Sequence, residues 1–137
     1  MVDASALLEV LLQAPAAEPI AERLFDPEET LHAPHLLDVE VAQILRRYVL
    51  LGEIDAGRGR EALTDLADLS VERYPHDPLL ARIWELRDNA TAYDAAYLAL
   101  AEALGAPLLT CDARLARAMD SLSGFEGSVE LFEAGSR

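Results

Sequence analysis

Apolar residues recur at helical spacing in several segments of this chain. The segment SALLEVLLQAP (5–15) carries leucines on one face and ends near a proline, which predicts a helix that follows the end of a strand at Val2. The segment LLDVEVAQILRRYVLLG (36–52) has a second apolar stripe and a glycine at its end. It predicts another helix, with Glu40 in its first turn.

Weaker patterns surround these two helices. A polar stretch, FDPEETLHAPH (25–35), connects them without a predicted helix or strand. Helical spacing also runs through IDAGRGREALTDLADL (54–69), although two glycines weaken its start. LSVERYP (69–75) then alternates like a short strand, and PLLARIWELRD (78–88) predicts a further helix.

The last third of the chain has the clearest signals for where helices begin and end. Thr91 and Asp94 resemble a capping box, while Gly105 and Pro107 mark a helix end, so we predict a helix over residues 92–104. The remaining segments read as a buried strand (107–112), a helix (113–120) and a final strand (128–133). Strands and helices therefore alternate, which predicts an α/β fold with a mainly parallel central sheet flanked by helices in three layers.

Length and composition favour one soluble domain spanning residues 1–137. A 137-residue chain that is 52% hydrophobic can bury a sizeable core, and no linker or repeat divides it. Acidic residues interrupt the apolar N-terminus and no basic residues precede it, so neither a signal peptide nor a transmembrane helix is expected. We therefore expect a cytoplasmic protein, with its single cysteine, Cys111, packed as a small apolar residue.

The charge balance excludes several functions. The formal net charge is −14, all 11 cationic residues are arginines, and no lysine is present. Such an acidic chain is not expected to coat nucleic acid through a broad basic face, although a local arginine-lined groove stays open.

Four carboxylates are expected at one edge of the sheet. Asp3 and Asp112 each follow a strand, and Glu40 and Asp94 each lie near a helix start. Taken singly, each acid is explained by helix capping. Because the carboxyl ends of parallel strands and the starts of the following helices share one edge, all four acids can also meet there.

Carboxylates gathered within a few ångströms repel one another unless a cation neutralises them. An all-oxygen set of this kind suits Mg²⁺ or Mn²⁺, ions that keep several waters and contact substrate phosphates. Either one or two such ions can activate water and stabilise charge on an attacked phosphate, which makes phosphodiester hydrolysis the expected chemistry.

The chain resembles the PIN-domain family, and more closely the VapC-like ribonuclease toxins of prokaryotic toxin–antitoxin pairs. The resemblance covers nearly the whole chain and rests on DASAL (3–7), on Glu40 within LLDVEVAQILRR (36–47), and on TAYDAAYLALAEALGAPLLTCDARLA (91–116). The sequence departs from the family pattern at its start, since only two residues precede Asp3. A short first strand, or a true start further upstream, is expected from this.

The resemblance implies a metal-dependent endoribonuclease, held inactive by a cognate VapB-like antitoxin. It implies that the acids Asp3, Glu40, Asp94 and Asp112 hold Mg²⁺ or Mn²⁺ and are catalytic. Ser5 and Thr110 would support them by hydrogen bonds to Asp3 or to metal-bound water, although a helix cap and an ordinary strand residue explain these two equally well.

RNA phosphates are expected to meet arginine side chains near the site. Arg87, Asn89 and Arg114 are the better candidates for substrate binding, while Arg46 and Arg47 fit a solvated helix face. Apolar helices in the N-terminal half, if exposed, would be covered in a homodimer or by an antitoxin peptide. Filling the core explains them equally well.

Other site types fit less well. A haloacid-dehalogenase-type phosphatase or a receiver domain resembles this pattern but normally needs a lysine, and the glycine-rich nucleotide motifs are missing. His32, His35 and His76, which we place in proline-containing loops, do not have zinc-site spacing. The remaining alternative is a catalytically inactive PIN-like module that binds protein or RNA.

Overall fold

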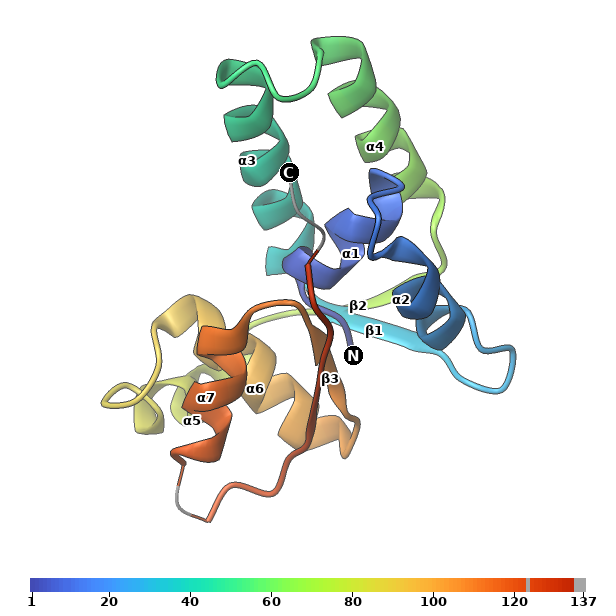
Figure 1. Ribbon diagram of the computed structural model, residues 1–137. Coiled ribbons are helices and arrows are strands. Elements are labelled where there is room, and N and C mark those ends of the chain that lie inside the picture. The colour runs from blue at the N-terminus through green and yellow to red at the C-terminus, as the bar shows by residue number, and fades with distance from the viewer. Residues whose placement is uncertain (123, 135–137) are drawn as a thin grey trace.

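The structure, a computed structural model, describes residues 1–122 and 124–134, with helices on both sides of a parallel sheet (Figure 1). The helices are α1 (Ala4–Leu11), α2 (Ala17–Leu24), α3 (Leu36–Leu50), α4 (Ala56–Asp68), α5 (Leu80–Glu85), α6 (Ala92–Leu104) and α7 (Ala113–Asp120), with a 3-10 turn at Asp77–Leu79. The strands are β1 (Leu31–Pro34), β2 (Val71–Tyr74), β3 (Leu108–Thr110) and β4 (Val129–Leu131). The predicted α/β class is confirmed.

The first three residues connect two pairs of strands. β1 pairs with β2 and β3 pairs with β4, both in parallel. The Val2 amide donates to the carbonyl of His32 at 3.1 Å, and the Leu109 amide donates to the carbonyl of Met1 at 2.8 Å. The order across the sheet is therefore β2, β1, residues 1–3, β3, β4. The predicted first strand is reduced to one parallel bridge between Val2 and Leu109.

Two apolar clusters fill the space on either side of this sheet. In Figure 1, α1 to α4 lie on one side and α5 to α7 on the other. Neighbouring strand residues point to opposite faces, so Leu109 packs with the α1 to α4 cluster and Leu108 with the α6 and α7 cluster. Both faces are covered, as expected for a parallel sheet.

Two elements were not predicted from the sequence. β1 lies inside the polar stretch 25–35, so the placement of His32 in a loop was wrong. The strand has only four residues, and its pairing with β2 and Val2 forms it rather than any local pattern. α2 was missed because Pro19 interrupts its sequence, although a proline in the first helical turn leaves no helical hydrogen bond unmade.

The helices that carry the acids agree with the predictions, with one correction. α6 spans the predicted residues, the Asp94 amide donates to the Thr91 hydroxyl at 3.1 Å, and Gly105 ends the helix with φ of +61°. α3 begins at Leu36, which puts Asp38 in its first turn and Glu40 in its second. Within the described residues, no helix combines the length and apolarity needed to cross a membrane.

Candidate metal centre and arginine-lined cleft

Asp3 caps the first helix and is held by three donors. Its Oδ1 accepts hydrogen bonds from the Ala6 amide at 3.0 Å and from the Ser5 hydroxyl at 2.7 Å. The Thr110 hydroxyl, from the end of β3, donates to Oδ2. Ser5 in turn accepts from the Cys111 amide at 2.9 Å, so the start of α1 and the end of β3 are joined through Asp3.

The environment of Asp3 favours its protonated form. Burial raises its pKa to about 6, the hydrogen bonds from Thr110, Ala6 and Ser5 oppose this, and the charge of Asp112 adds to it. Burial is the largest of these causes, and a cation beside Asp3 would act against it by favouring the charged carboxylate.

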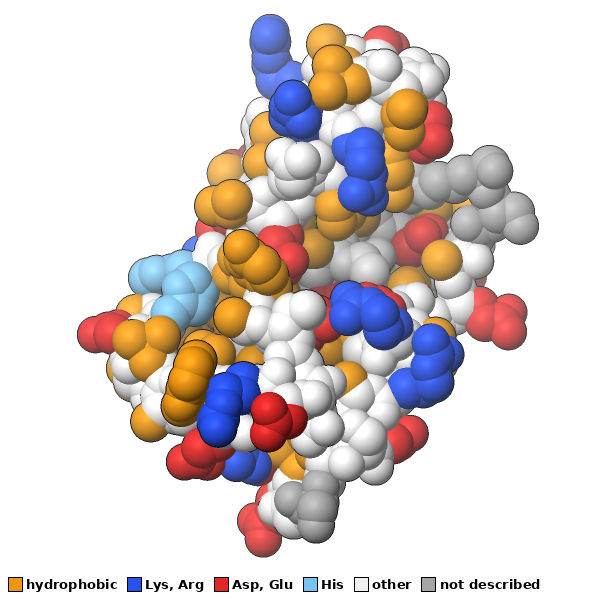
Figure 2. Space-filling view, turned by 90° about the vertical axis from the view of Figure 1, so that its left-hand side faces the viewer, with side chains coloured by type: hydrophobic (Ala, Val, Ile, Leu, Met, Phe, Trp, Pro, Cys, Tyr) orange, Lys and Arg blue, Asp and Glu red, His pale blue; other side chains and the backbone are white. Residues whose placement is uncertain are grey.

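Asp94 and Asp112 share one arginine. The Nη1 of Arg114 donates to Oδ2 of Asp94 at 2.6 Å, and its Nη2 lies 3.3 Å from Oδ2 of Asp112. Asp112 also caps α7, because its Oδ1 accepts the amides of Arg114 at 2.9 Å and Leu115 at 3.3 Å. Figure 2 shows basic side chains of this face lying beside and over acidic ones. The two aspartates therefore cap or begin helices and, at the same time, face a common cation.

Glu40 approaches from the other side of the sheet edge. Its pKa is raised, chiefly by burial and further by the charge of Asp94, while the nearby Tyr97 hydroxyl opposes the shift. No hydrogen bond of normal length and angle joins that hydroxyl to Glu40 or to any other described group, although Tyr97 is only 2% exposed. Asp38, on the same helix, is paired with Arg73 at 2.7 Å and does not take part.

We call the four predicted acids the acidic row, because each is linked to the next: the charge of Asp94 raises the pKa of Glu40, Arg114 pairs with both Asp94 and Asp112, and the charge of Asp112 raises the pKa of Asp3. Among residues 1–122 and 124–134, no three Asp, Glu, His or Cys side chains are close enough together to hold a metal ion as they stand. The chemistry of the donor set still fits Mg²⁺ or Mn²⁺, because it consists of carboxylates. In the metal-free protein Arg114 neutralises part of their charge through its ion pairs with Asp94 and Asp112.

Tyr97 was not singled out from the sequence. It lies three residues after Asp94, so both side chains project from the same face of α6. Its surroundings raise its pKa, first through burial, then through the charge and the close hydroxyl–carboxylate contact of Glu40, and further through the charges of Asp3 and Asp38. The three-residue spacing from Asp94 could have indicated Tyr97. An aromatic residue on an apolar helix is, however, usually interpreted as part of the core.

A cleft of about 600 Å³ opens beside the acids. Its lining includes Arg87, Asn89 and Arg114, the three residues predicted to bind substrate, together with Arg117. The Arg87 guanidinium lies 4.8 Å from the centre of the Trp84 ring and donates to the Trp84 carbonyl at 2.9 Å. Arg46 instead lines a separate apolar groove between α3 and α4. Positive charge is therefore concentrated next to the acidic row.

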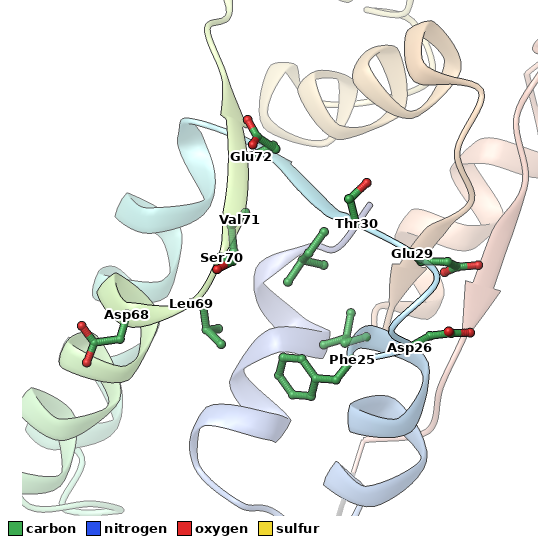
Figure 3. Close-up of a pocket in the computed structure, with 11 residues that line it drawn as sticks. Phe25, Asp26, Glu29, Thr30, Asp68, Leu69, Ser70, Val71 and Glu72 are labelled. Atoms are coloured by element: carbon green, nitrogen blue, oxygen red, sulfur yellow. The ribbon is translucent and has the colours of Figure 1, made fainter.

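A larger groove, of about 720 Å³, lies at the other edge of the sheet (Figure 3). It is bordered by Leu31 and Val71, the first residues of β1 and β2. Figure 3 shows the Phe25 and Leu69 side chains directed into it, while acidic side chains at its rim point outward. Because these acids diverge and none of the predicted site residues lines it, this groove is not the candidate site.

The remaining reactive side chains have ordinary roles. Burial, together with the charges of Glu9 and Asp3, raises the pKa of the Cys111 thiol to about 12, so the thiol stays protonated. His32 contacts the hydroxyl of Tyr74 at 2.7 Å, and His76 accepts a hydrogen bond from the Leu36 amide at 3.1 Å. These contacts give both histidines structural partners.

Known proteins resemble this chain in both sequence and fold. The PIN domain family model matches residues 1–120, which include all four acids and the cleft. Ribonuclease VapC1 of Mycobacterium tuberculosis is 48% identical over 119 residues, covering 86% of this chain and 89% of that protein. PAE2754 from Pyrobaculum aerophilum has a TM-score of 0.65 at 28% identity, covering 93% of this chain and 80% of that one.

A second solved structure shares the fold at lower identity. VapBC2 from Rickettsia felis, bound to a DNA fragment from their promoter, gives a TM-score of 0.67 at 13% identity and covers 97% of this chain and 98% of that chain. The overall fold is thus shared with a solved structure of low sequence identity.

Proposed function

The chain belongs to the PIN-domain family, among the VapC ribonucleases, and from this premise we propose that it is a metal-dependent endoribonuclease acting as the toxin of a toxin–antitoxin pair. The observation that carries the proposal is the acidic row, in which Arg114 joins Asp94 to Asp112, directly beside an arginine-lined cleft. Hydrolysis of RNA phosphodiester bonds needs both parts, a place for a divalent cation and a place for the RNA backbone.

Asp3, Glu40, Asp94 and Asp112 would hold Mg²⁺ or Mn²⁺. Such an ion lowers the pKa of an attacking water and stabilises charge on the phosphate. Ser5 and Thr110 fix the orientation of the Asp3 carboxylate through their hydroxyls. Because the pKa values of Asp3 and Glu40 are raised, the site carries protons that leave when a cation binds.

The cleft residues bind and position the RNA. The guanidinium groups of Arg87, Arg114 and Arg117 would contact phosphates on either side of the scissile bond. Asn89 offers both a donor and an acceptor to a sugar or base edge. An acidic protein can bind RNA in this way because its basic groups are gathered in one place, next to the phosphate that is attacked. We propose that the protein meets its RNA substrate in the cytoplasm.

An antitoxin and a second copy of the chain are the proposed protein partners. The groove between α3 and α4, about 340 Å³ in volume, has an apolar floor that includes Leu45 and Val49, with Arg46 and Arg60 at its sides. Leu50 beside it is 68% exposed. An amphipathic antitoxin segment with acidic flanks fits this groove, and an inhibitory group entering the acidic row would block metal or RNA binding.

Metal binding is tested by titrating Mn²⁺ or Mg²⁺ into the wild type and Asp94→Asn, with heat as the signal. The wild type should bind and Asp94→Asn should bind at least about ten-fold more weakly, since one ligand oxygen loses its charge. Asp120→Asn, at the exposed end of α7, is the matched control. Equal Mn²⁺ or Mg²⁺ binding by the wild type and Asp94→Asn would rule out the proposed metal site.

An RNA cleavage assay separates the enzyme from an inactive binding module. Asp112→Asn keeps a capping oxygen for the Arg114 and Leu115 amides, so the fold should persist. Its cleavage rate should fall about 10²-fold or more. RNA binding without metal-dependent cleavage by the wild type would favour the module.

A further inference from the structure

The backbone of Arg114 is fixed in a helix, whereas its paired side chain is largely exposed to solvent. Its backbone amide donates to Oδ1 of Asp112 at 2.9 Å, which fixes its position in the first turn of α7. Its side chain is 60% exposed, whereas the side chain of its partner Asp94 is 13% exposed. The guanidinium therefore reaches inward from solvent and can leave the two aspartates without disturbing the core.

The same residue also lines the cleft. Arg114 lines it together with Arg87 and Arg117. A turn of its side chain is enough to move the guanidinium from the aspartates toward the position of an RNA phosphate. Arginine suits both positions, because its planar donor group binds carboxylates and phosphates alike.

A divalent cation and this guanidinium cannot occupy the same place. Oxygens that coordinate Mg²⁺ or Mn²⁺ lie about 2.1 Å from the ion, which would put the ion where Nη1 and Nη2 now meet Asp94 and Asp112. A divalent ion and a guanidinium bound to the same two carboxylates would repel each other strongly in a half-buried site. One must leave before the other binds.

We propose that Arg114 is the counter-ion of Asp94 and Asp112 in the metal-free protein, and that metal binding exchanges it into the cleft, where it binds an RNA phosphate. This inference rests on the proposed metal-dependent function. It couples the two ligands: metal releases Arg114 for RNA, and RNA, by holding Arg114 in the cleft, raises metal affinity by the same factor.

The experiment is Mn²⁺ titration calorimetry without RNA on wild type, Arg114→Gln and Arg117→Gln. Removing the competing guanidinium should tighten Mn²⁺ binding about three-fold or more, the size expected for two partly exposed ion pairs. Arg117→Gln removes the same charge from the same cleft, and Arg117 forms no ion pair within residues 1–122 and 124–134, so it should change Mn²⁺ binding less than two-fold. Thermal midpoints with chelator and with Mn²⁺ provide the second readout, and their gap should be larger in Arg114→Gln than in wild type.

The outcomes separate this inference from the function on which it rests. Mn²⁺ binding that is equal or weaker in Arg114→Gln overturns the exchange and leaves the metal site intact. Equal tightening in Arg117→Gln also overturns it, because net charge alone then explains the effect. No Mn²⁺ binding by any variant overturns both. If Arg114→Gln does not fold, Arg114→Lys replaces it, with intermediate tightening expected because an ammonium cannot bridge both aspartates.

Discussion

The carboxylate of Asp3 and the hydroxyl of Thr110, 107 positions apart in the sequence, are joined by a hydrogen bond inside the protein. Thr110 is fully buried, and its hydroxyl also accepts the Asp112 amide at 2.9 Å. One side chain at the end of β3 thus orients two of the four acids. The bond lies where the first residues of the chain enter the sheet, so the acidic row depends on correct assembly of the fold.

Thr110→Val should destabilise the protein and impair the site. Valine has a similar shape but no hydroxyl, so the buried Asp3 carboxylate loses a donor at a cost of about 1–3 kcal/mol in the free energy of unfolding. The pKa of Asp3 should rise further, since the Thr110 bond opposes its upward shift. Urea unfolding measures the first effect and the acid limb of the pH–rate profile the second. Thr110→Ser, which keeps the hydroxyl, is the control; a valine variant that matches it in both would refute the role of this bond.

The stability of the metal-free protein should fall as the pH rises from 5 to 7. The folded pKa of Asp3 is about 6 against an ordinary value of 3.8, so the folded state binds a proton that the unfolded state has released. Stability from this group is complete below the ordinary pKa and is lost as the pH passes the folded one, a change of about 1 kcal/mol over this range. The pKa of Glu40 is also raised, so this group likewise makes the protein less stable as the pH increases.

Urea unfolding in chelator at pH 5 and pH 7 measures this dependence. Asp3→Asn should be less sensitive to pH than the wild type, because asparagine keeps the cap but does not titrate. The same slope in both proteins would show that Asp3 is not the titrating group. Mn²⁺ affinity of the wild type should rise over the same pH range, since cation binding requires the charged carboxylates.

Tyr97→Phe should separate stability from function. The hydroxyl is buried and makes no hydrogen bond of normal length and angle within the described residues, although it lies close enough to Glu40 to oppose the raised pKa of that carboxyl, so its removal should change the free energy of unfolding by no more than about 1 kcal/mol in either direction. Cleavage and Mn²⁺ affinity should nevertheless fall, because the hydroxyl faces the acidic row. Tyr93→Phe, on a side chain that is 64% exposed, removes the same group from the same helix. If both variants cleave RNA alike, Tyr97 has only a packing role.

Arg87→Gln should weaken RNA binding with little effect on the chemical step. Arg87 lines the cleft but does not contact the acids, so KM should rise several-fold while kcat stays within about two-fold. The dependence of RNA affinity on salt should become shallower by about one unit, as expected when one phosphate contact is lost. Arg47→Gln, on an exposed position of α3, should change neither. A loss of kcat with unchanged KM would contradict this assignment.

The sequence was sufficient for the first helix, which follows Asp3, and for the last third of the chain, where capping residues and apolar spacing agree. α6 is the clearest case, since Thr91 and Gly105 fix both of its ends locally. The sequence did not show that the strand before Asp3 is reduced to one bridge. β1 could not be predicted, because Leu31–Pro34 becomes a strand only through its pairing with Val2 and β2.

The candidate site was accessible to sequence reasoning only in part. The topology of a parallel sheet predicts one shared edge for Asp3, Glu40, Asp94 and Asp112, and their role as metal ligands stays a prediction. The structure moves Glu40 from the first turn of its helix to the second. The bridging position of Arg114 and the unpaired hydroxyl of Tyr97 depend on side-chain directions and neighbours. Neither follows from spacing, so the state of the site without its metal had to come from the structure.

Anomalous diffraction from crystals grown with Mn²⁺ tests the proposed metal site most directly, because it locates the ion without reference to activity. We expect an anomalous peak about 2.1 Å from carboxylate oxygens of Asp94 and Asp112, with Asp3 and Glu40 around it and the Arg114 guanidinium displaced into the cleft. Well-ordered crystals at saturating Mn²⁺ with no peak at this edge of the sheet, and Arg114 still bridging Asp94 and Asp112, would contradict it.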